Sequence, residues 1–157
     1  MQLSSRGYRL LRKVVQRYRL LTSSMTLGVR CAVIDPQGRV LLVRPRLVPG
    51  WHFPGGGIEL GETAVEALRR ELLEEARVEL TDAPELHGFF QNVETTWRDH
   101  EAFYIARHFR VLEQRGPDFE IMECRFFDQT ALPPDLEPGA RRRLLEIQEG
   151  RQPAERW

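Results

Sequence analysis

Apolar positions recur with two different periods in the first part of the chain. In residues 5–22 they are spaced three and four apart, as on one face of a helix, with arginines on the other faces. The apolar runs 27–34 and 40–44 are strand-like, and Asp35-Pro36-Gln37-Gly38 between them is typical of a hairpin turn. The pattern predicts a basic amphipathic helix followed by two strands. The helical stripe consists of Leu11, Val14, Val15, Tyr18 and Leu21.

Helical spacing returns after Thr63. Thr63 and Glu66 have the spacing of a capping box, in which each side chain bonds the other residue's backbone N–H, so we expect a helix to begin here. Arg69 falls within the apolar arc of this helix and fits it poorly. The arc consists of Val65, Leu68, Leu72 and Ala76.

The second half of the chain predicts three more strands and a closing helix. The strand-like runs are 86–94, 102–111 and 121–127, and the helix lies between Pro138 and Gly150. Strands before and after one helix, followed by a closing helix, suggest a mixed sheet sandwiched between helices. We therefore predict an α+β fold.

Three carboxylates lie on one edge of the helix that follows Thr63. Glu71, Glu74 and Glu75 share one turn of one face, where like charges repel by roughly 0.2–0.5 kcal/mol per pair. A bridging cation would turn this repulsion into a binding site, and carboxylates without nearby Cys or His favour Mg²⁺ or Mn²⁺. The alternative is a solvated acidic face. The glycines at 55–57 favour the site, because glycine lets the main chain approach a ligand closely.

The sequence GGIELGETAVEALRRELLEEARV, from Gly56 to Val78, resembles the Nudix box of the Nudix hydrolases. That pattern is G-x5-E-x7-R-E-U-x-E-E-x-G-U, where U is aliphatic, and eight of its nine defined positions match. Arg77 stands where the family has glycine. This position falls at the helix end, where αL geometry is common and a side chain costs about 1 kcal/mol. We expect the departure to affect helix termination and to leave the chemistry intact.

The resemblance implies both a fold and a reaction. The fold would be an α/β/α sandwich with a mixed sheet over residues 25–157, preceded by the basic helical extension of residues 1–24. The reaction would be hydrolysis of a phosphoanhydride bond in a nucleoside diphosphate linked to another moiety, by a metal-activated water. The implied cofactor is Mg²⁺ or Mn²⁺, and the implied partner is a small nucleoside diphosphate derivative.

The resemblance also implies roles within the box. Glu74 and Glu75 would be metal ligands, the main-chain carbonyl of Gly56 a further ligand, and Glu71 either a ligand or the catalytic base.

Two more residues of the box would support these ligands. Arg70 would orient Glu71 through a charge-assisted hydrogen bond, with a simple surface pair to Glu74 as the alternative. Glu62 would support the junction of loop and helix.

Residues outside the box form a second group of candidates, each with an ordinary structural alternative. The arginines could meet substrate phosphates, the aromatics could stack on a base, and the acids could add a ligand or a base. The alternatives are a solvated strand end, a core aromatic and a solvated loop acid. The group consists of Arg44, Arg46, Trp51, Phe90, Asp118 and Glu120.

The charge of the chain is unevenly distributed. Its formal net charge is zero, yet residues 1–34 carry seven basic side chains and no acid. We expect the basic helix to pack on the domain or across a homodimer, in preference to a membrane surface or nucleic acid. With no apolar run long enough to span a bilayer and no secretory stretch, we expect a cytoplasmic protein.

Two other functions stay open. An RNA 5′-end pyrophosphohydrolase could use the basic helix to follow the phosphates of the strand. A catalytically idle Nudix-like module would only bind a nucleotide. Such modules usually lack carboxylates of the box, and all of these are present here.

Overall fold

The computed structural model describes residues 25–93, 96–113 and 119–157. The predicted helix at 5–22 and the candidate Asp118 lie outside the described residues and stay predictions. None of the described helices is long and apolar enough to cross a membrane.

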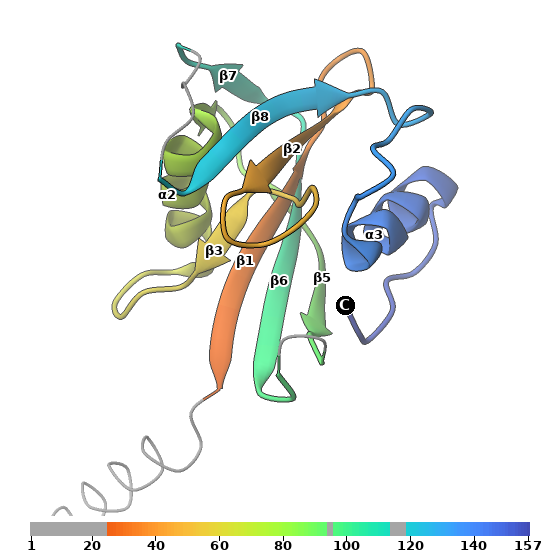
Figure 1. The fold of residues 1–157 in the computed structure, drawn as a ribbon. Helices are drawn as coiled ribbons and strands as arrows, with labels where there is room; N and C mark the ends of the chain where they lie inside the picture. Colours follow the sequence, from red (N-terminus) through yellow and green to blue (C-terminus); the bar gives the residue numbers. More distant parts are fainter. Residues whose placement is uncertain (1–24, 94–95, 114–118) are drawn as a thin grey trace, which may run out of the picture.

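The centre of the fold is a mixed sheet of four strands in the order β3-β1-β6-β5 (Figure 1). These strands are β1 (Thr26–Val33), β3 (Gly55–Gly57), β5 (Glu85–Gln91) and β6 (Asp99–Ala106). β1 pairs antiparallel with β3 and parallel with β6, which pairs antiparallel with β5. The mixed sheet predicted from the sequence is thereby confirmed.

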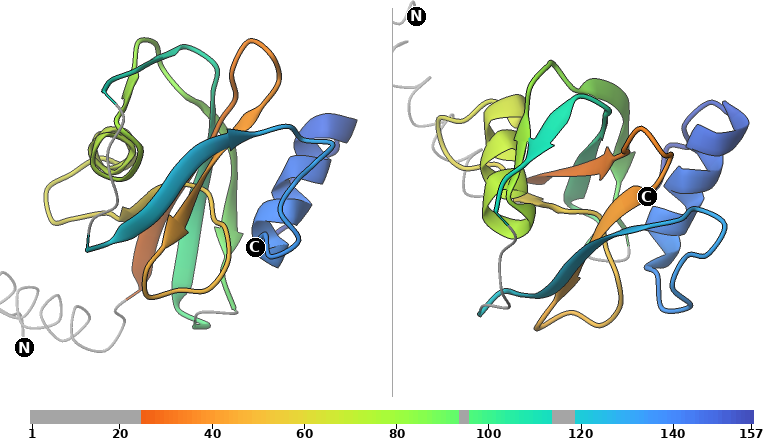
Figure 2. Two further views of the ribbon diagram at one scale, coloured as in Figure 1. Left: turned by 45° about the horizontal axis from the view of Figure 1, so that its top comes forward. Right: turned by 90° about the horizontal axis from the view of Figure 1, so that it is seen from above.

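Two strand pairs and two helices complete the domain. β2 (Val40–Pro45) pairs with β8 (Ile121–Phe127), and β4 (Val78–Leu80) pairs with β7 (Phe109–Val111), both antiparallel. The helices α2 (Ala64–Ala76) and α3 (Pro138–Glu149) lie on opposite sides of the strands, as Figure 2 shows in the view from above. The described residues therefore have the α+β architecture of a sheet between helices.

The core is divided between the two faces of the sheet. Because side chains alternate along a strand, Val29 and Cys31 of β1 face α2, whereas Ala32 faces the opposite side. The cluster under α2 contains Leu68, Leu72 and Tyr104. The cluster on the α3 side contains Phe53, Phe90, Phe103, Leu144 and Trp157. Phe90, a predicted candidate for base stacking, is fully buried there.

Three features differ from the sequence prediction. The run 102–111 is not one strand, because it breaks between β6 and β7, where the His108 carbonyl accepts a bond from the Thr81 N–H. β3 and β4 are not predicted by the sequence. β3 is a run of glycines and β4 has only three residues, so neither carries an alternating pattern. Arg69 has a structural partner after all: its Nη1 donates to the carbonyl of Leu80 at 2.8 Å.

One part of the α2-side face of the sheet is left uncovered. α2 packs on β1, β3 and β4, whereas Leu86 and Phe89 of β5 stay more than half exposed. Phe89 stacks on His100 with ring centroids 5.4 Å apart, and His100 is the register partner of Leu27. An exposed apolar strip therefore runs across the sheet to the point where the chain enters β1.

Deleting residues 1–24 is expected to lower the melting temperature or to break a homodimer. The predicted apolar stripe of this segment needs burial, and the exposed strip at Leu27 and Phe89 lies beside its attachment point. Melting temperature and mass in solution, measured for both lengths of the protein, test this. Unchanged stability and mass, together with binding of the full chain to anionic vesicles, would show the segment to be a membrane anchor.

Candidate active site

The glycine run forms the edge strand β3, where Gly55 requires glycine and Gly56 lies directly against a side chain of α2. Gly55 has a φ of 147°, and a Cβ on it would collide with the carbonyl oxygen of Val29. A Cβ on Gly56 would collide with the carboxylate of Glu71. The glycines therefore bring the main chain of β3 directly against β1 and against the acidic edge of α2.

Both ends of α2 are fixed by its sequence. Thr63 caps the first turn, and both bonds of the capping box to Glu66 are present, as predicted. Arg77 forms the C-cap with a φ of 54°, and it is the one non-glycine residue with positive φ in the described parts of the chain. The helix thus ends in the αL geometry for which glycine is best suited.

Replacing Arg77 with glycine is expected to raise the free energy of unfolding by up to about 1 kcal/mol. The gain comes from removing a Cβ from αL backbone and is reduced by the larger entropy of glycine in the unfolded chain. Chemical denaturation measures it. Arg77→Ala, which loses the charge but keeps the Cβ, is the control and should show no gain; an equal gain in both variants would contradict the strain argument.

Glu75 is held at the centre of the site. Its side chain is buried, with 9% of the residue exposed, and its Oε2 accepts a hydrogen bond of 2.8 Å from the Gly55 N–H. Burial raises the pKa of Glu75 to about 7, and the charges of Glu71 and Glu120 act in the same direction. Glu75 is therefore a buried carboxylate near two like charges, which the charge of Arg30 and the bond from Gly55 offset only in part.

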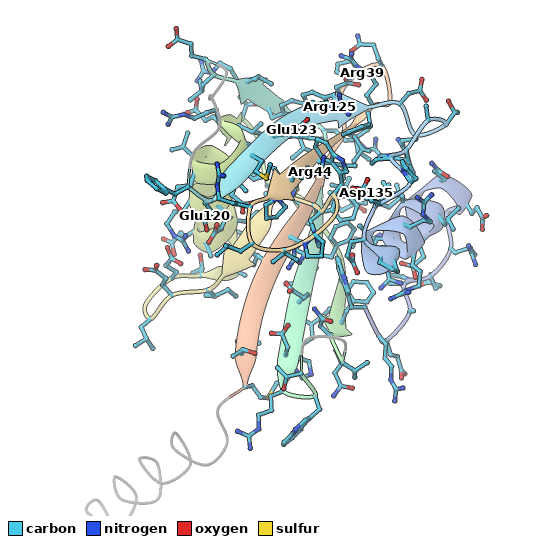
Figure 3. The ribbon with its side chains drawn as sticks, in the orientation of Figure 1. Arg39, Arg44, Glu120, Glu123, Arg125 and Asp135 are labelled. Atoms are coloured by element: carbon cyan, nitrogen blue, oxygen red, sulfur yellow. The ribbon has the colours of Figure 1, made fainter. Side chains whose placement is uncertain are left out.

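Glu71 and Glu120 converge on the same place from different elements. Burial raises the pKa of Glu71, and Glu74 and Glu120 add to this, whereas the bond from Arg70 opposes it. Glu120 precedes β8, and its carbonyl accepts a bond of 2.8 Å from the N–H of Arg46. Figure 3 shows Glu120 beside α2. Glu120, predicted as a further ligand or base, thus lies close to two glutamates of the box.

Arg70 links four groups of the loop and the helix. Its Nη1 donates to Glu71 at 2.7 Å and to Glu74 at 3.3 Å, and its Nη2 donates to the carbonyl of Gly57 at 3.0 Å. Nε and Nη2 bond both carboxylate oxygens of Glu62, at 2.8 and 3.0 Å. These bonds lower the pKa of Glu62 to about 2. The structure thus contains the predicted Arg70–Glu71 bond and also the surface contact to Glu74.

Arg46 is joined to Glu120 through its backbone, whereas Arg44 and Trp51 do not line the part of the site formed by the glutamates. Arg44 forms ion pairs with Glu123 and Asp135, each with an N···O distance of 3.6 Å; Figure 3 labels all three residues. Trp51 is 2% exposed and packs edge-on against Phe127 in the core. This burial argues against the predicted stacking of a base on Trp51, because neither ring face is open.

A cavity of about 540 Å³ opens beside the glutamates. Glu75, Gly55 and Glu120 line one part of it, and apolar walls come from β2, the loop after it and Phe53. Arg30, Asn92 and Trp157 also line the cavity, and none of the three is among the site residues that the sequence predicts. For Arg30 a signal existed, since it is the single charged residue in the apolar strand TLGVRCAV.

The donor set fits a hard divalent cation in chemistry, but the described residues do not form a closed cage. No three Asp, Glu, His or Cys side chains in those parts of the chain are close enough to hold an ion by themselves. Glu74 has a side chain that is 55% exposed and leans toward Arg70. Oxygen ligands that leave positions open suit Mg²⁺, which keeps waters and shares substrate phosphates.

Comparison with known proteins agrees with this geometry. Over 50 residues the chain is 44% identical to a Bacillus subtilis (strain 168) protein named "Putative 8-oxo-dGTP diphosphatase", with 32% of this chain and 34% of that protein covered. Over 48 residues it is 48% identical to an RNA pyrophosphohydrolase of Halorhodospira halophila (strain DSM 244 / SL1), covering 31% and 26%. The matches therefore span only about a third and a quarter of these relatives.

The fold and the family are established over a longer range. The crystal structure of a MutT NUDIX hydrolase from Burkholderia pseudomallei superposes with a TM-score of 0.68 at 23% identity, covering 78% of this chain and 97% of that one. At this identity the likeness shows the fold. The model of the NUDIX domain matches residues 25–147, which is most of the chain. The chain belongs to the NUDIX domain family.

Proposed function

We propose that the protein hydrolyses a phosphoanhydride bond in a nucleoside diphosphate linked to another moiety, with Mg²⁺ or Mn²⁺ as cofactor. The observation that supports this is that Glu75 and Glu120 line one cavity and that Glu71 lies close enough to both for their charges to interact. Like charges in a partly buried place disfavour ionisation, and a divalent cation between them removes that penalty.

Glu71, Glu74, Glu75 and the carbonyl of Gly56 would hold the metal. A bound divalent ion lowers the pKa of a coordinated water and offsets charge on the phosphoryl oxygens. The chain itself sets the positions of the ligands: the Gly55 N–H holds Glu75, and Arg70 holds Glu71. Arg70 is in turn anchored on Glu62, so its guanidinium stays beside the site.

The cavity suits the nucleoside part of such a substrate. Its volume of about 540 Å³ lies within the range of about 300–1,000 Å³ found for small-ligand sites. Val43, Phe53 and Trp157 supply apolar wall, and Arg30 and Asn92 supply polar groups. A group of mononucleotide size can therefore lie next to the glutamates.

An RNA 5′-end pyrophosphohydrolase is the second candidate. It is favoured by the relative from Halorhodospira halophila, which is named RNA pyrophosphohydrolase. The idle binding module is the third reading, and the presence of every carboxylate of the box argues against it.

A substrate panel separates these functions. Nucleoside triphosphates, nucleoside diphosphate sugars, dinucleoside polyphosphates and a 5′-triphosphorylated RNA are incubated with Mg²⁺ or Mn²⁺, with and without excess EDTA. We expect release of phosphate or nucleotide from a small substrate, abolished by EDTA. Hydrolysis of the RNA alone supports the second candidate. No hydrolysis of any substrate, or hydrolysis that EDTA leaves unchanged, contradicts the proposal.

A further inference from the structure

Arg30 is a charged residue on an otherwise apolar strand, and its side chain reaches the cavity. It lies in the middle of β1, and its register partner across the sheet is Gly55. The N–H of Gly55 holds Glu75, and the charge of Arg30 acts on Glu75. Arg30, Gly55 and Glu75 all line the same cavity. A cation and the buried carboxylate of the site therefore border one space.

The guanidinium of Arg30 is held in a defined orientation. Its Nε donates to Oε1 of Glu101 at 3.3 Å, and its Nη1 donates to the carbonyl of Phe53 at 3.4 Å. The group lies 5.8 Å from the ring centre of Trp157. Nη2 makes no hydrogen bond to any residue that the structure describes. The contacts thus orient the group but leave donor capacity on the side of the cavity.

Glu101 is built into the sheet as the partner of Arg30. It is 5% exposed, and it lies against the Cα of Gly28, where a Cβ would collide with its carboxylate. The Asn92 side chain also hydrogen-bonds to it. Burial, packing against Gly28 and the bond from Asn92 keep the Glu101 carboxylate in one position. Through its bond to Arg30 it therefore fixes the position of the guanidinium.

The contact between the two is weaker than an ion pair built for stability would be. A single bond of 3.3 Å joins Arg30 and Glu101, in place of the two parallel bonds of a bidentate pair. The Arg30 side chain keeps 26% of its surface exposed, against 6% for Glu101. The guanidinium thus has both the donors and the access to bind an anion from the cavity.

We propose that Arg30 binds the diphosphate oxygens of the substrate from the cavity side, opposite the glutamates of α2, and that Glu101 is its positioning residue. This inference rests on the proposed function. A diphosphate bound through a cation at Glu71 and Glu75 would still have negative oxygens that need a second cationic partner. The planar fork of Arg30 matches such oxygens with two donors, which a lysine cannot do.

The test is binding of imidodiphosphate, a pyrophosphate analogue that resists hydrolysis, in the presence of Mg²⁺. Isothermal titration is carried out on the full chain and on Arg30→Lys, Arg30→Gln and Glu101→Gln, with melting temperatures alongside. The matched control is Arg39→Gln, because Arg39 also pairs with one carboxylate, Asp35, and lies 5.7 Å from the centre of an aromatic ring, yet does not line this cavity.

We expect Arg30→Lys to weaken the affinity about tenfold and Arg30→Gln up to about a hundredfold, with the melting temperature of Arg30→Lys kept. KM for the substrate found in the panel should rise in parallel, Glu101→Gln should lie between these variants and the wild type, and Arg39→Gln should match the wild type. Wild-type affinity in both Arg30 variants of an active protein overturns the inference alone. The inference is also overturned if Arg30→Lys has the affinity and the melting temperature of the wild type, because Arg30 would then only balance the charge of Glu101. A wild-type protein that neither binds the analogue nor hydrolyses any substrate overturns the proposed function as well.

Discussion

Replacing Glu75 with glutamine is expected to lower turnover by at least about a hundredfold. Glutamine keeps the size of the side chain and can still accept the hydrogen bond from the Gly55 N–H, so the backbone around the site stays in place. What it loses is the negative charge that a divalent cation requires. The effect should appear in kcat with the best substrate of the panel, at a metal concentration that saturates the wild type.

The control for this variant is Glu79→Gln. Glu79 lies on β4, away from the site, with a half-exposed side chain that accepts a bond of 2.7 Å from Arg110. It loses the same charge from a surface position, so its turnover should stay at the wild-type level. Near-normal turnover of Glu75→Gln would show that Glu75 is a structural residue.

The helix of the box could be predicted in detail because its signals are local. Thr63 and Glu66 cap the helix start through neighbouring residues, and the spacing of Leu68 and Leu72 fixes the buried face. The αL position of Arg77 followed from the place of a glycine in the family pattern. Each of these depends on residues within a few positions of one another.

The parts that could not be predicted depend on contacts between distant segments. Glu101 meets Arg30 only because β1 and β6 are adjacent and parallel, and 71 positions separate the two residues. β3 carries no side-chain pattern at all, so its pairing with β1 is visible only in the fold. Trp51 is of the residue type that often stacks on ligands, yet the packing of β2 and β8 places it in the core.

Burial of Glu75 is another tertiary effect, and it changes the size of a prediction. Helical spacing alone predicts that Glu75→Gln stabilises the metal-free protein by a few tenths of a kcal/mol, because it relieves repulsion with Glu71 and Glu74. The structure shows instead a carboxylate that is 9% exposed. Loss of solvation then exceeds the repulsion along the helix as the reason why its charge is unfavourable.

The metal-free protein is therefore expected to lose stability as the pH rises from about 4.5 to above 7. The pKa of Glu75 is raised from 4.5 to about 7 in the folded protein, so the folded state binds this proton more tightly than the unfolded chain. The contribution of this proton to the free energy of unfolding is complete below pH 4.5 and is lost as the pH rises through 7. A shift of this size corresponds to about 3 kcal/mol.

The contribution of Glu75 can be isolated by comparing the wild type with Glu75→Gln in EDTA. Glu71 and Glu101, whose pKa values are also raised by burial, are present in both proteins, so their contributions cancel apart from the repulsion between Glu71 and Glu75. At pH 4.5 the protonated glutamate resembles glutamine, and the two unfolding free energies should nearly agree. By pH 8 the variant should be more stable by about 3 kcal/mol, measured by urea denaturation. A difference that does not change with pH would mean that the charge of Glu75 is solvated in the metal-free protein. There would then be no cost of burying this charge for a bound cation to offset.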